Sequence, residues 1–170
     1  GNDYFLFVGA LSPRKNVARL LRAYEQFKNK TQSGTKLVIV GEKMFKTHDI
    51  KNAYRQSKFK NDIVFTGRLL PEELKKLYAA SLALVFVPYF EGFGIPIAEA
   101  MYCETAVITS NVTSMPEVAG DAALYAGPFS VDSVADAMYK IYSDPGLRKS
   151  LIEKGKAQRN LFSWDKTAED

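Results

Sequence analysis

The sequence predicts an α/β protein of Rossmann-like architecture, in which a six-stranded, mostly parallel sheet lies between two layers of helices. Two observations support this class. Short, continuous apolar runs alternate along the chain with segments whose apolar residues recur at helical spacing. Several of the apolar runs end directly at a glycine, as expected of strands that are buried on both faces. Short connections between alternating strands and helices imply right-handed crossovers, and therefore a parallel sheet.

Six segments are expected to form the strands. The first, residues 4–8, reads Tyr-Phe-Leu-Phe-Val and is followed by Gly9. The others are residues 37–40, 63–66, 82–87, 106–109 and 123–125, of which the fourth strand is the most apolar. Because a buried strand begins almost at the first residue, we expect the chain to start in the middle of a longer protein.

Helices are expected after the strands almost without exception, with a loop after the fifth strand. The apolar positions that follow the first strand recur at helical spacing: Val17, Leu20, Leu21, Tyr24 and Phe27. A polar helix is expected at about residues 49–58. Pro71, followed by two glutamates, is typical of a helix start. Further helices are expected at 95–102, around 134–141 and from Leu147 onward, and no linker interrupts the pattern. We therefore expect one domain over residues 1–170.

Composition limits the classes of function. The chain has 23 basic and 19 acidic residues, a net charge of +4 that suits a small anionic ligand or a nearby membrane. This excess is too small for nucleic-acid binding, and no basic stripe is interleaved with aromatic residues. A single histidine, His48, leaves no Cys/His cluster for zinc or iron, and we expect it on the surface.

The single cysteine, Cys103, excludes an internal disulfide and fits a reducing compartment. We expect it to behave as a buried small hydrophobic residue. No secretion leader opens the sequence and no apolar run is long enough to cross a bilayer. These features predict a cytoplasmic protein, with peripheral association of the parent enzyme at the inner face of the membrane as an open alternative.

The first candidate binding segment follows the first strand. Arg14 and Lys15 lie where a helix begins, so the two cations, the free backbone N–H groups and the helix dipole would together hold a phosphate or diphosphate. The alternative is that Ser12 or Asn16 merely caps the helix while the cations point into water. The segment lacks the G-x-G-x-x-G pattern, which argues against an NAD or FAD site.

The second candidate segment follows the fourth strand and reads Glu91-Gly-Phe-Gly-Ile-Pro-Ile-Ala-Glu99. Gly92 and Gly94 allow the backbone to approach a ligand closely. Carboxylates at Glu91 and Glu99 are natural acceptors for sugar hydroxyls, including a ribose diol. The alternative for Glu99 is an early helical position that is stabilised by the helix dipole alone.

The Glu91-x7-Glu99 motif resembles the signature of the large retaining glycosyltransferase family 4, the group 1 glycosyltransferases. Residues 13–16, Pro-Arg-Lys-Asn, match the phosphate-binding segment of that family, and further matches lie at 65–67, 110–123 and 162–164. The resemblance covers essentially the whole chain. It implies the carboxy-terminal, donor-binding half of the two-domain GT-B architecture, with the amino-terminal acceptor domain absent from this sequence.

The resemblance also implies roles for particular residues. The residues expected to act in catalysis, on the donor diphosphate and the transferred sugar, are Arg14, Lys15 and Glu91. The donor is expected to contact Gly9 after the first strand, the backbone N–H groups of Phe93, Gly94 and Ile95, and Glu99, which would hold the ribose. Its base is expected to lie against Gly67, Arg68 and Leu69. Many family members carry Gly-Arg after the first strand, whereas this sequence has Gly9-Ala10. Arg14 would then hold more of the phosphate charge.

This set of residues suits a transferase that needs no metal ion and no cofactor. Breaking a glycosyl–phosphate bond develops negative charge on a diphosphate, which fixed cations and N–H dipoles stabilise. No Asp-x-Asp motif is present, so we expect metal independence. By analogy, residues 13–16 and 110–114 favour mannosyltransferases and GDP-mannose. Two alternatives remain open: a GT-B-like sugar-nucleotide epimerase or phosphorylase, and a nucleotide-binding module without turnover.

Two weaker candidates and one expectation about the isolated domain complete the prediction. Residues 114–117 are expected to start a short helix near the ligand, with Glu117 either a helix-start charge or a support for the site. Trp164 is expected to be a packing anchor within the domain. We expect the isolated domain to bind a nucleotide but to transfer nothing.

Overall fold

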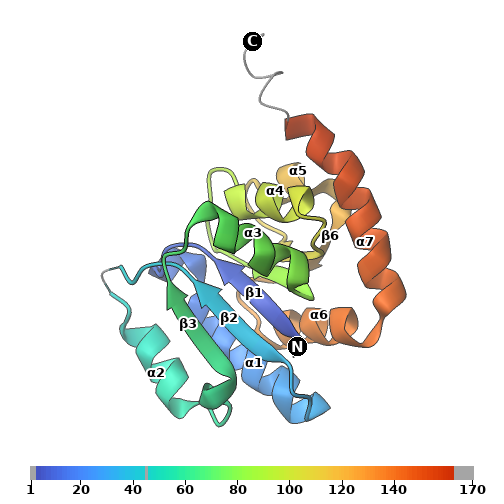
Figure 1. The fold of residues 1–170 in the computed structure, drawn as a ribbon. Coiled ribbons are helices and arrows are strands. Elements are labelled where there is room, and N and C mark those ends of the chain that lie inside the picture. Colours follow the sequence, from blue (N-terminus) through green and yellow to red (C-terminus); the bar gives the residue numbers. More distant parts are fainter. Residues whose placement is uncertain (1–2, 45, 163–170) are drawn as a thin grey trace.

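The computed structural model describes residues 3–44 and 46–162. Within these residues the strands form one six-stranded sheet in the order β3-β2-β1-β4-β5-β6, and every neighbouring pair is parallel (Figure 1). The strands are β1 (Tyr4–Val8), β2 (Lys36–Val40), β3 (Ile63–Gly67), β4 (Ala83–Phe86), β5 (Val107–Ser110) and β6 (Ala123–Ala126). The prediction of a six-stranded sheet is thus confirmed, and the sheet is parallel throughout rather than mostly so.

Helices cover both faces of the sheet (Figure 1). One layer contains α1 (Val17–Thr31), α2 (His48–Gln56) and α6 (Val131–Ser143), with α1 packed between the other two. The other layer contains α3 (Pro71–Ala80), α4 (Ile95–Tyr102) and α5 (Met115–Ala119), while α7 (Pro145–Gln158) packs against α4 and α6. Short 3-10 turns are η1 (Pro13–Lys15), η2 (Lys60–Asp62), η3 (Gly120–Ala122) and η4 (Arg159–Phe162). Among the described helices, none combines the length and apolar character that a bilayer span requires.

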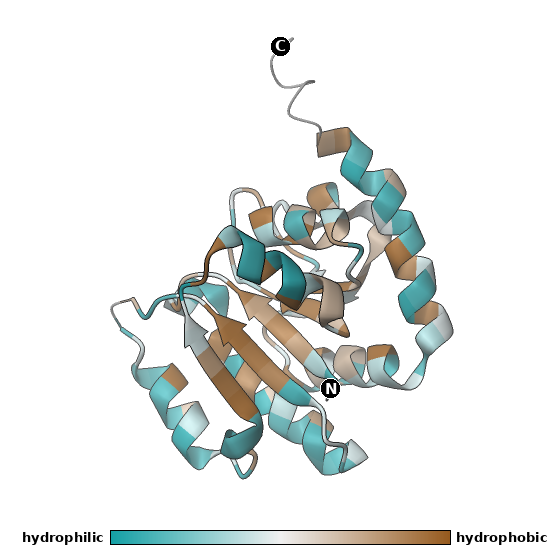
Figure 2. Cartoon of the chain, in the orientation of Figure 1, coloured by the Kyte–Doolittle hydropathy of each residue, from teal (hydrophilic) through white to brown (hydrophobic). Residues whose placement is uncertain are grey.

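The strands form the centre of the hydrophobic core, as Figure 2 shows by their brown colour against the teal outer surfaces of the helices. All four residues of β4, the central strand, are buried. In contrast, β3 lies at the edge of the sheet, and Val64 is 38% exposed. The strand limits differ from the predicted ones by at most one residue and those of α2 by at most two, which is the usual uncertainty of element ends, while α6 begins three residues before the expected range.

Three glycines shape the edge of the sheet at which the strands end. Gly9 donates its N–H to the carbonyl of Val40 at 2.9 Å, and Gly41 donates to the carbonyl of Gly67 at 3.1 Å. Gly41 has φ 149°, and a Cβ atom there would lie 1.8 Å from the carbonyl oxygen of Gly9. Because only glycine allows this approach, the ends of β1, β2 and β3 stay in register at this edge.

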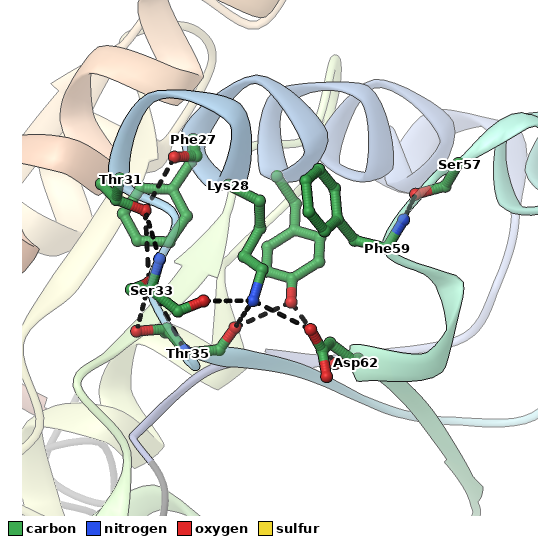
Figure 3. A network of polar contacts seen from close by, with 9 residues as sticks. Phe27, Lys28, Thr31, Ser33, Thr35, Ser57, Phe59 and Asp62 are labelled. Carbon is green, nitrogen blue, oxygen red and sulfur yellow. Dashed lines mark hydrogen bonds and ion pairs between the residues drawn. The ribbon is translucent and has the colours of Figure 1, made fainter.

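At the opposite edge, a buried lysine links helix α1 to the beginnings of β2 and β3 (Figure 3). Lys28 is 3% exposed, and its ammonium group donates to the carbonyls of Ser33 and Thr35. It also forms an ion pair with Asp62 at 2.9 Å. A buried charge needs partners of this kind to offset its lost hydration. The network holds the sheet and α1 together at the edge remote from the strand ends.

Candidate functional site

The first predicted segment and the second meet at the ends of β1 and β4, which are adjacent strands. The ammonium of Lys15, in η1, forms an ion pair with the Glu91 carboxylate at 2.6 Å, and the two side chains are only 11% and 18% exposed. Lys15 also lies over the ring of Phe86 at 5.2 Å. Arg14 is exposed. The alternative in which both cations point into water is therefore wrong for Lys15.

Asn16 braces this turn instead of capping helix α1. It adopts a left-handed conformation with φ 65°, and neither Asn16 nor Ser12 makes a side-chain capping bond. The amide of Asn16 is buried and donates to the carbonyl of Val87 at 2.9 Å and to the carbonyl of Pro128 at 2.7 Å. The turn is thereby tied to the end of β4 and to the loop after β6, so the alternative in which the Asn16 or Ser12 side chain merely caps the helix is wrong.

Arg19 extends the same brace, and the sequence analysis missed it. Its guanidinium donates to Asn16 Oδ1 at 3.0 Å, to the Tyr89 hydroxyl at 2.6 Å and to the Pro128 carbonyl at 2.6 Å. It also lies over the Tyr89 ring at 5.3 Å, and Tyr89 stacks on Phe129. These contacts fix the loop that carries the ion-paired glutamate. The sequence signal was slight: an arginine three positions after an asparagine at a helix start.

Glu99 is the fifth residue of α4 and lies beyond the first turn, where the helix dipole acts most strongly. The alternative in which the helix dipole alone stabilises Glu99 therefore fits this position poorly. Its carboxylate instead accepts a hydrogen bond of 2.7 Å from the hydroxyl of Tyr78, in α3. Tyr78 is 1% exposed, and burial together with the Glu99 carboxylate raises its pKa well above the ordinary value. Tyr78 is thus a permanent donor to Glu99 at physiological pH.

Glu99 and Tyr78 lie on the wall of a cavity of about 640 Å³ between α3, α4 and η4. Its apolar wall consists of Pro71, Leu74, Phe93, Ile95, Ala98, Leu161 and Phe162. Phe93, from the second predicted segment, packs edge to face against Phe162 at 5.6 Å between ring centres. The cavity therefore combines a carboxylate with an apolar surface.

The predicted base-binding residues flank this cavity without lining it. Gly67 ends β3, and Arg68 and Leu69 connect it to α3, whose first residue, Pro71, lines the cavity. Arg68 is exposed and Leu69 is partly buried. A ligand in the cavity would have to extend past Pro71 to reach these three residues.

The start of α4 and the short helix α5 pack together beside Glu91. As predicted, a short helix begins near residue 115, and the Ser114 hydroxyl donates to the Glu91 carbonyl at 2.7 Å. A Cβ atom at Gly94 would lie 2.9 Å from Ile97 Cδ1 and 3.1 Å from Met115 Cε, so packing alone already favours glycine there. Glu117 is exposed.

Three other predictions concern isolated residues. His48 is exposed at the start of α2, as predicted. Cys103 is half-buried, not fully buried, and lines the cavity beside Glu99. Partial burial and, to a lesser extent, the Glu99 carboxylate raise the pKa of its thiol. Trp164 lies outside the described residues. In residues 3–44 and 46–162, no group of three or more metal-ligating side chains is found.

These features define a class of protein: a Rossmann-like domain in which cations and a carboxylate lie at the edge where parallel strands end, the usual ligand-binding edge of such sheets, with a cavity between the neighbouring helices α3 and α4. Residues 1–158 match the family model of the group 1 glycosyl transferases. The chain therefore belongs to the group 1 glycosyltransferase family. It is 36% identical over 162 residues to O-antigen chain mannosyltransferase B of Escherichia coli, an alignment that covers 95% of this chain and 42% of that protein.

Solved structures confirm the fold. Sucrose-phosphate synthase from Thermosynechococcus elongatus has a TM-score of 0.85 and 26% identity, over 96% of this chain and 42% of that one. The C-terminal domain of the group 1 glycosyltransferase LpcC from Francisella tularensis has a TM-score of 0.81 and 24% identity, over 94% of this chain and 86% of that domain. The chain thus spans less than half the length of the mannosyltransferase but most of an isolated C-terminal domain.

Proposed function

We propose that this chain is the donor-binding domain of a retaining glycosyltransferase that transfers a sugar, most simply mannose, from a nucleoside diphosphate sugar. The proposal is carried by the ion pair of Lys15 and Glu91 at the ends of adjacent strands, together with Glu99 on the wall of a cavity of about 640 Å³ between α3 and α4. The mannosyltransferase relative supports the class of sugar. The acceptor and the rest of the active site would belong to the other half of a longer protein.

In this proposal the diphosphate lies between η1 and the start of α4. Arg14, which is exposed, and Lys15 supply positive charge, and the backbone N–H groups of residues 93–95 supply fixed dipoles at the beginning of α4. Negative charge grows on the diphosphate as the glycosyl–phosphate bond breaks. Groups that are already oriented toward this charge lower the barrier because they need no reorganisation.

Glu91 would face the transferred sugar. Its ion pair with Lys15 and the bond from Ser114 to its carbonyl hold it at the junction of the sugar and diphosphate sites. One carboxylate oxygen engages Lys15, so the other is able to accept a sugar hydroxyl. Loss of Glu91 should therefore affect the sugar more than the bare nucleotide.

Glu99 would hold the ribose, with the nucleoside in the cavity between α3 and α4. The cavity volume falls within the range of about 300–1,000 Å³ that is common for small-molecule sites. Its apolar wall suits a base, and a carboxylate on the wall suits a vicinal diol. Leu69 and Arg68, beside the cavity, would then contact the outer edge of the base.

The test is calorimetric titration of wild-type, Glu99→Gln and Glu91→Gln chains with GDP, UDP and ADP. A hydrogen bond to a charged group contributes about 1.5–3 kcal/mol, so Glu99→Gln should weaken binding of the preferred nucleotide by roughly tenfold or more. Glu91→Gln should leave binding of the bare nucleotide almost unchanged and impair sugar transfer in a protein that includes the acceptor domain. If both variants bind nucleotide like the wild type, the donor-site assignment fails.

A corollary concerns this chain alone. Because half of a GT-B active site would lie outside it, we expect binding of the donor without sugar transfer. Robust transfer by the 170-residue chain would contradict this part of the proposal.

A further inference from the structure

The contact between Tyr78 and Glu99 joins the two helices that border the cavity. Tyr78 lies in α3 and Glu99 in α4, both line the cavity, and the tyrosine hydroxyl donates to Glu99 Oε2 at 2.7 Å. Tyr78 is 1% exposed, so its ring is enclosed by the core. The sequence motif contains Glu99 but not Tyr78, which lies 21 positions earlier in the chain.

The backbone of Tyr78 is held in place by hydrogen bonds. Its backbone carbonyl accepts hydrogen bonds from the Thr105 hydroxyl at 2.7 Å, from the Ser81 hydroxyl at 2.9 Å and from the Ser81 N–H at 3.2 Å. The Thr105 bond attaches the end of α3 to the segment between α4 and β5, and the two Ser81 bonds close the last turn of α3. Because both the backbone and the ring are immobilised, the hydroxyl is held at one place on the cavity wall.

This donor orients the carboxylate and leaves its charge intact. An ionised carboxylate has about four acceptor positions, and Tyr78 occupies one of them on Oε2. In the described part of the chain, Glu99 has no cationic partner within 4.0 Å, unlike Glu91. The remaining positions of the Glu99 carboxylate are therefore free to accept from ligand hydroxyl groups.

We propose that Tyr78 is a positioning residue, which holds Glu99 in the orientation that receives the vicinal diol of a ribonucleotide. This inference rests on the proposed function and adds to it a source of selectivity for ribose. A glutamate that is already immobilised loses less side-chain freedom when the ligand binds. Tyr78 thus acts through Glu99 and need not touch the ligand.

The test uses Tyr78→Phe, which removes one oxygen atom and keeps the ring. The matched control is Tyr24→Phe, because Tyr24 is 0% exposed and its hydroxyl donates to the Thr35 carbonyl at 2.8 Å at the opposite edge of the sheet. Each variant is titrated by calorimetry with GDP and with 2′,3′-dideoxy-GDP, or with the UDP pair if the wild type prefers UDP. Melting temperatures report the loss of stability that both variants share.

We expect Tyr78→Phe to weaken GDP binding by roughly two- to tenfold, the range expected when a side chain must be ordered by its ligand. Its affinity for the dideoxy nucleotide should equal that of the wild type. Tyr24→Phe should change neither affinity. Equal weakening of both nucleotides by Tyr78→Phe, or an unchanged GDP affinity, would overturn the inference.

Glu99→Gln separates this inference from the proposed function. If Glu99→Gln weakens GDP and Tyr78→Phe does not, the donor site stands and the role of Tyr78 falls. If Glu99→Gln has no effect, the donor site itself falls, and the inference falls with it. If Tyr78→Phe does not fold, a structure of the wild-type chain with bound GDP provides the test instead. We expect the Tyr78–Glu99 hydrogen bond to persist while Glu99 contacts the ribose. A Glu99 side chain that breaks its bond to Tyr78 in order to reach the ligand would refute the proposal.

Discussion

The brace at Asn16 provides a demanding test of the structure, because its removal should affect stability through two separate causes. Asn16→Ala deletes the two buried hydrogen bonds that the side chain donates to the carbonyls of Val87 and Pro128. It also deletes the part-buried bond from Arg19, but that guanidinium keeps its bonds to Tyr89 and Pro128, so this loss is not counted below. The substitution also places alanine at φ 65°, where a Cβ atom without a compensating side chain is unfavourable. Asn16→Gly deletes the same bonds but tolerates this backbone conformation.

The magnitudes follow from these two causes. Each neutral hydrogen bond contributes about 1 kcal/mol to the free energy of unfolding, and the left-handed conformation costs alanine about 1 to 2 kcal/mol. Asn16→Ala should therefore lower the free energy of unfolding by about 3 to 4 kcal/mol. Asn16→Gly should lower it by about 2 to 3 kcal/mol, since glycine also has a more flexible unfolded chain. For a domain of this size, the alanine variant should melt roughly 10 °C below the wild type.

Urea denaturation followed by circular dichroism measures all three proteins under one condition. The slope of the free energy against urea concentration should be unchanged, so that a lower midpoint reports stability alone. An alanine variant that loses less than about 1 kcal/mol would refute the brace, since such a loss is smaller than two buried bonds. A glycine variant as unstable as the alanine variant would show that the backbone strain of alanine at position 16 is no larger than the entropic cost of glycine.

Three further predictions concern other parts of the molecule. Gly41→Ala should yield little folded protein or a much lower melting temperature, because its Cβ would meet the Gly9 carbonyl oxygen; wild-type stability would contradict this close contact. Above pH 10 the free energy of unfolding should fall by up to about 1.4 kcal/mol per pH unit for each of Tyr24 and Tyr78. Burial raises the pKa of both hydroxyls, so the unfolded chain loses these protons at lower pH than the folded chain. A free energy of unfolding, measured with urea, that does not change from pH 8 to 11 would refute this prediction. Finally, EDTA should leave calorimetric nucleotide affinity unchanged, and a loss that magnesium or manganese restores would show that a metal ion holds the diphosphate.

Local sequence signals were sufficient for the elements of this fold. The continuous apolar run of β4 predicts a strand because only burial on both faces accommodates it, and all four of its residues are buried. Pro71 predicts a helix start because its fixed φ and missing N–H suit that position, and α3 begins there. Glu91 and Glu99 could be identified as candidate site residues because their spacing matches the motif of the group 1 glycosyltransferases. Each of these signals acts within a few neighbouring residues.

Side-chain partners from distant parts of the chain could not be predicted from such local signals. Lys15 and Glu91 are 76 positions apart, and Asn16 and Pro128 are 112 positions apart. They meet because β1 lies beside β4, and the order of the strands depends on how the whole chain packs. The capping alternative for Asn16 fails for the same reason, because its side-chain amide donates to two carbonyls that are distant in the sequence. The sequence alone therefore determined the strands, the helices and the Glu91-x7-Glu99 motif of this protein, because their signals are local. Only the tertiary structure decided that Lys15 pairs with Glu91, that Asn16 braces the turn and that Tyr78 holds Glu99, because each contact requires elements that the folded core brings together.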